Sequence, residues 1–62
     1  MQTYNELITS ETARLQRAST RELSSIAAAL SLHSWANTLE EKARLDAAQR
    51  LISERLRAKR RA

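Results

Sequence analysis

The 62-residue sequence contains no cysteine, glycine, proline or phenylalanine, and each absence removes a class of structure. Without cysteine there is no disulfide framework, and a single histidine cannot supply the ligand set of a zinc site. Without glycine, the backbone loops that cradle phosphates in nucleotide-binding proteins are missing. Hairpin turns rely on Gly, Asn or Asp, and strands favour aromatics, of which the chain has two. The sequence therefore predicts an all-α protein with no cofactor and no metal.

The abundant residues are good helix formers, and three Ser/Thr-x-x-Glu patterns indicate where helices begin. In such a capping box the hydroxyl accepts from the backbone amide three residues on, and the glutamate there reaches back to the first residue. The three patterns are Thr3 with Glu6, Ser19 with Glu22, and Thr38 with Glu41. They predict helix starts near Tyr4, Thr20 and Leu39.

Apolar spacing gives a competing interpretation of the first half of the chain. If one helix continues through Ser19, a single narrow face collects Tyr4, Leu7, Ile8, Leu15, Ala18, Ile26 and Ala29. Only Glu11, Glu22 and Ser25 interrupt that face, and serine and threonine are tolerated inside helices. We therefore expect one helix over residues 4 to about 31, with a break at residues 18–20 as the alternative.

Beyond Ala29 the apolar face moves around the helix axis, so a straight helix could not bury both halves against one neighbour. We expect a turn over residues 32–37, in which Asn37 takes a left-handed conformation, and a last helix over about 38–60. The pairs Glu40–Arg44 and Asp46–Arg50 have the i,i+4 spacing of ion pairs on its surface. The predicted fold is a helical hairpin of two long helices, or three helices if the first is broken near Ser19, in one domain spanning residues 1–62.

A chain this short buries only about 60% of its unfolded surface, so self-association is expected. The only tryptophan, Trp35, is too large for a two-helix hairpin to cover well. We expect a homodimer that assembles as a helix bundle and that also binds another protein. The residues predicted at the dimer or partner interface are Tyr4, Leu7, Ile8, Leu15, Trp35, Leu39, Leu51 and Ile52.

No group of residues predicts enzymatic activity or a small-molecule substrate. His33 is the only ordinary base near neutral pH, and serines lie beside it only because this part of the chain is rich in serine. The longest apolar run, Ile26–Leu30, is far shorter than the ~20 residues of a membrane-spanning helix. The absence of cysteine fits the cytoplasm. We therefore expect a cytoplasmic, non-enzymatic protein that acts by binding.

Basic residues are concentrated at the end of the chain. The net charge is +4, yet the residues before Arg55 sum to −1, because the last eight residues carry five bases and no acid: Arg55, Arg57, Lys59, Arg60 and Arg61. Such a tail steers association with an acidic protein or contacts nucleic acid. We expect a small regulator of phage or plasmid type that occupies a protein surface. The alternatives are a nucleic-acid-binding regulator that uses this tail and, less favoured, an amphipathic helix on anionic lipid.

Overall fold

Three helices and one short 3-10 turn make up the structure, which is a computed structural model that describes residues 3–61 and the side chains of residues 3–60. In chain order the elements are α1 (Tyr4–Leu15), α2 (Thr20–Leu32), the 3-10 turn η1 (Ser34–Ala36) and α3 (Leu39–Arg61). No strand occurs among the described residues. The all-α prediction is therefore confirmed.

Each helix begins at its predicted capping box. The backbone amide of the glutamate donates to the Ser or Thr hydroxyl at 3.2 Å for Glu6 and Thr3, 3.1 Å for Glu22 and Ser19, and 3.2 Å for Glu41 and Thr38. At α3 the box is reciprocal, because the Thr38 amide also donates to Glu41 Oε1 at 3.0 Å. The hydrogen bond from the Thr38 amide to the carboxylate, followed by the Thr38 side chain, lowers the pKa of Glu41, since both favour its ionised form.

The expected continuous helix over residues 4–31 does not form, and the alternative break near Ser19 is the observed arrangement. Helix α1 ends at Leu15, and Ser19 has extended dihedral angles, φ −69° and ψ 160°, as the N-cap of α2. The break has a tertiary cause. It places α1 and α2 on different sides of α3, so that Leu15 and Leu23 both reach one core cluster.

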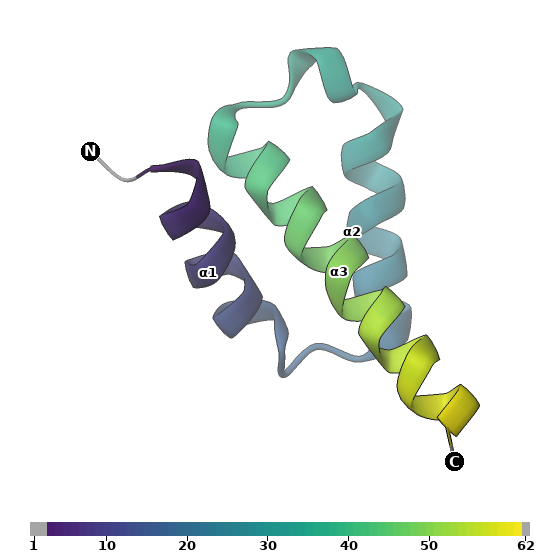
Figure 1. Cartoon of the computed structure of the whole chain (residues 1–62). Helices are drawn as coiled ribbons and strands as arrows, with labels where there is room; N and C mark the ends of the chain where they lie inside the picture. The colour runs from purple at the N-terminus through teal and green to yellow at the C-terminus, as the bar shows by residue number, and fades with distance from the viewer. Residues whose placement is uncertain (1–2, 62) are drawn as a thin grey trace.

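Helix α3 lies between the other two, parallel to α1 and antiparallel to α2 (Figure 1). Both pack on α3 and hardly touch each other. One core cluster joins α1 to α3 through Leu7, Ile8 and Ala43, with Tyr4 beside it. The second joins all three helices through Leu15, Leu23, Ala47, Ala48 and Leu51. The alanines of these two clusters are fully buried, and their small side chains allow two helices to approach α3 closely.

The end of α2 differs from the prediction, because Asn37 is not left-handed. Its φ is −68° and its ψ is 140°, and no described residue has a positive φ. Instead, Asn37 Nδ2 donates to the backbone oxygen of Leu30 at 2.8 Å. The side chain therefore satisfies a carbonyl at the helix end that a left-handed residue would otherwise have satisfied through its amide.

The two predicted surface ion pairs of α3 were also wrong. Among the described residues, Arg44 pairs with Glu11 of α1 and not with Glu40, and its Nε lies 3.4 Å from Glu11 Oε2. Asp46 accepts a hydrogen bond from the Tyr4 hydroxyl and is not paired with Arg50. Partners on the neighbouring helix α1 replace the i,i+4 partners, because α1 covers this side of α3.

Candidate interaction surfaces

Large apolar side chains are exposed at the end of the molecule where α2 turns into α3. Leu32 is 76% exposed, Trp35 is 84% exposed and Leu39 is 53% exposed. The Trp35 ring lies edge-on to that of His33, with the ring centres 6.1 Å apart. A tryptophan exposed to this degree loses hydrophobic free energy that a covering surface would recover. This end is therefore a candidate binding surface.

The same part of the chain carries no formal charge. Residues 23–39 contain no Asp, Glu, Lys or Arg, although 29% of the whole sequence is charged. Only Leu23 is buried in this stretch, which we call the uncharged end. Interface centres are typically depleted in charge, whereas a face that remains in water usually carries it.

The predicted interface residues separate into two groups in the structure. Trp35 and Leu39 are exposed, whereas the others help to form the core of the single chain. The buried residues are Leu7, Ile8, Leu15 and Leu51, and the partly buried residues are Tyr4 and Ile52. Helical spacing shows that these residues share a face, but it does not show whether that face meets the same chain or another one.

An apolar groove of about 510 Å³ runs between α1 and α2 on one side of α3. Leu15, Ile26, Ala29 and Leu30 form its apolar part, and the side chains of Arg14 and Arg44 also line it. It exists because the two outer helices hardly touch each other. Leu15 belongs to α1, and the other three apolar residues belong to α2.

Sequence reasoning missed the cross-helix contact at Glu11. This carboxylate is 8% exposed, and it lies 3.4 Å from Arg44 Nε and 3.7 Å from Arg14 Nη1. A buried carboxylate requires such a partner, since loss of the partner would leave an uncompensated charge. The available signal was the position of Glu11 on the apolar face of α1, where an acid is costly unless a base from another helix reaches it.

One base of the basic tail has a structural role, and three others are exposed on the surface. The Arg55 guanidinium donates to Thr20 Oγ1 at 3.2 Å and to the backbone oxygen of Gln16 at 3.1 Å, so Arg55 ties α3 to the turn between α1 and α2. Arg57, Lys59 and Arg60 are exposed. The side chain of Arg61 lies outside the described residues.

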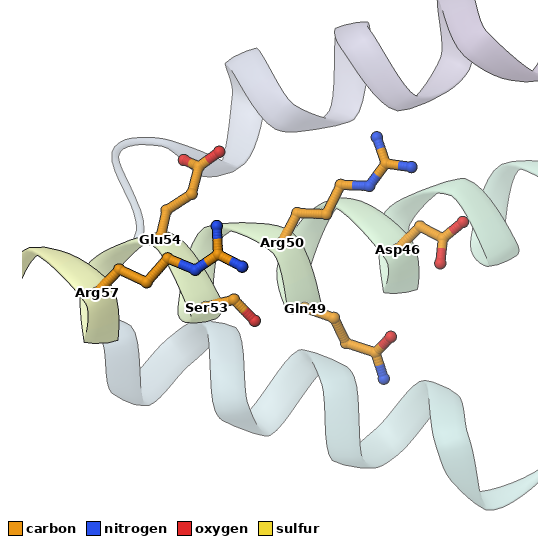
Figure 2. Close-up of a pocket in the computed structure, with 6 residues that line it drawn as sticks. All are labelled: Asp46, Gln49, Arg50, Ser53, Glu54 and Arg57. Atoms are coloured by element: carbon orange, nitrogen blue, oxygen red, sulfur yellow. The ribbon is translucent and has the colours of Figure 1, made fainter.

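One face of α3, beside its contact with α1, is polar. Figure 2 shows its side chains, all from one helix, with both signs of charge in the same row: Asp46, Gln49, Arg50, Ser53, Glu54 and Arg57. Within the described residues, no group of three or more His, Cys, Asp or Glu side chains could hold a metal ion. The mixed charges suit a solvated face, since they do not converge on one ligand.

The Tyr4–Asp46 hydrogen bond makes a pH dependence testable. The hydrogen bond to Asp46, followed by desolvation and the charge of Asp46, raises the pKa of Tyr4 above that of a free tyrosine. A raised pKa in the folded state stabilises the fold below the ordinary tyrosine pKa, and this contribution is lost as the pH rises through the folded value.

We expect an ultraviolet absorbance titration of this single tyrosine to show ionisation above its ordinary range, and D46N to lower the midpoint. Equal midpoints for the wild type and the variant would contradict the hydrogen bond.

Comparisons with protein-family models, with curated proteins and with solved structures find no match to this chain. Among the described residues, no helical segment combines the length and the apolar character that a bilayer crossing requires.

Proposed function

We propose that this chain is a small, cytoplasmic, non-enzymatic regulatory protein of phage or plasmid type, which acts as a homodimer and blocks a surface of another protein by occupying it. The observation that carries the proposal is the uncharged end, with Trp35 84% exposed. Tryptophan is the residue type most enriched at the energetic centres of protein interfaces. A tryptophan that its own chain leaves largely exposed is best explained by a partner.

The second copy is assigned to the outer face of α2. Ser25, Ala28 and Leu32 are exposed and share one side of this helix, opposite the buried Leu23. A twofold interface places the same patch on both subunits, so a patch with an excess of one sign of charge repels its copy. In a chain of net charge +4, the uncharged end is the surface where two copies approach without this repulsion.

A charge placed on this face tests the dimer. We expect L32D to weaken dimerisation by about a hundredfold, because a like-charge contact across an interface costs several kcal/mol. Leu56 is 52% exposed and lies outside the uncharged end, so L56D is the matched control and should dimerise as the wild type does. Sedimentation equilibrium measures the dimer dissociation constant of each variant. Sedimentation of the wild type as a monomer at every concentration would overturn the dimer.

The partner surface is tested separately through Trp35. We expect W35A to keep its helical circular dichroism, since the side chain is 84% exposed, and to lose capture of the partner from nuclease-treated host lysate. A variant carrying R57Q and R60Q should keep that capture, because the contact is apolar. If W35A captures the same protein as the wild type does, Trp35 does not carry the interaction.

A nucleic-acid-binding regulator is the second candidate, favoured by the exposed bases Arg57, Lys59 and Arg60 at the end of α3. The uncharged end plays no part in that function.

A further inference from the structure

Charge is unevenly distributed along the long direction of the molecule. Eight bases and only two acids lie in residues 14–22 and 50–60. The other described segments, residues 3–13 and 23–49, contain five acids and two bases. The first set comes from the end of α1, the start of α2 and the second half of α3, and Figure 1 shows these segments at the same end of the molecule. The fold therefore adds arginines from the first half of the chain to the basic tail.

Arg55 fixes this arrangement. Its guanidinium bonds to Gln16 and Thr20, at 3.1 and 3.2 Å, hold the turn between α1 and α2 against α3. Arg17 and Arg21 directly follow those two residues, and both are exposed. Two bases of the turn are thereby held near the segment of α3 that carries Arg57, Lys59 and Arg60.

None of these five side chains takes part in an ion pair within the described residues, where the ion pairs are those of Glu11 with Arg14 and Arg44. The two acids in the basic segments are Glu22 and Glu54. Glu54 shares the polar face of α3 with Arg50 and Arg57 (Figure 2). Bases that exceed local acids on a fixed scaffold create a positive potential suited to a polyanion.

We propose that this basic end, defined as Arg17, Arg21, Arg57, Lys59 and Arg60, binds the phosphate backbone of double-stranded nucleic acid without reading its sequence. Arginine and lysine are the residues that neutralise backbone phosphates. No aromatic residue lies among residues 14–22 or 50–60 to stack on unpaired bases. Tyr4 hydrogen-bonds to Asp46, and the turn η1, which contains Trp35, lies at the opposite end of the molecule. The proposal goes beyond binding by the tail alone and does not rest on the dimer.

The test is fluorescence anisotropy of a labelled mixed-sequence duplex DNA of about two helical turns, titrated with the full chain from ~50 mM salt upward. We expect binding that weakens steeply with salt, equal affinity for a duplex of scrambled sequence, and weaker binding of the corresponding single strand. Absence of binding at the lowest salt would overturn the proposal, as would tighter binding of the single strand.

Matched single substitutions distinguish a phosphate contact made by the turn from an effect of net charge alone. R17Q and K42Q each remove one positive charge from an exposed position, but Lys42 lies at the acidic end of α3. We expect R17Q to lower the slope of log affinity against log salt by about 0.9, the contribution of one phosphate contact, and K42Q to leave it unchanged. Equal slopes for the two variants would show that the turn does not contact phosphate and would overturn the five-residue surface.

Discussion

Replacement of Leu23 by alanine is expected to remove a large part of the free energy of unfolding. Leu23 is the largest side chain that is completely buried, and it lies in the core cluster that joins all three helices. Truncation of a buried leucine to alanine costs about 2–5 kcal/mol, through lost transfer free energy and the cavity that remains. At about 0.05–0.15 kcal/mol per residue, a chain of this length has a total unfolding free energy of only about 3–9 kcal/mol.

The control for this substitution lies on α3. L56A makes the same chemical change at a side chain that is 52% exposed and lies outside the uncharged end, and it should alter the unfolding free energy by no more than about 1 kcal/mol. Urea titration followed by far-ultraviolet circular dichroism measures both variants. A cooperative transition for L23A at the wild-type midpoint would mean that the central cluster does not hold the helices together.

Enlargement of Ala47 to leucine is expected to be nearly as damaging. Ala47 is fully buried in the central cluster, where Leu15 and Leu23 from the two outer helices also lie. Extra methyl and methylene groups in a well-packed core cost about 1–3 kcal/mol, because side chains leave their rotamers and helices separate.

Ala58 offers the comparison on the same helix, since it is exposed. A58L should change the unfolding free energy by less than about 0.5 kcal/mol, because leucine and alanine are both good helix formers. Similar losses for A47L and A58L in urea unfolding would contradict the close approach of the helices at Ala47.

Local signals predicted the helix starts but not how the helices associate. The Thr3, Ser19 and Thr38 capping boxes could be identified because each depends on residues three positions apart. Local signals did not decide between a continuous and a broken first helix, because Ser19 is compatible with both. What decides it is the packing of α1 and α2 on different sides of α3, and that is a tertiary property.

The candidate surfaces also combine features that the sequence predicts with features that depend on tertiary contacts. The exposure of Trp35 follows from its position in the turn, and the sequence located both the residue and the turn. Leu7 and Leu51 had the same apolar character, yet the chain uses them in its own core. The contribution of Arg17 and Arg21 to the basic end could not be predicted, because it depends on the contact between Arg55 and residues far away in the chain.

The central position of α3 has a consequence for folding during synthesis. Helices α1 and α2 leave the ribosome first, yet each buries its apolar side on α3 and they hardly touch each other. Helices of 12 and 13 residues are marginal on their own in water. The chain therefore gains a stable core only when α3 has emerged, so folding follows the synthesis of this helix and does not begin at the N-terminus.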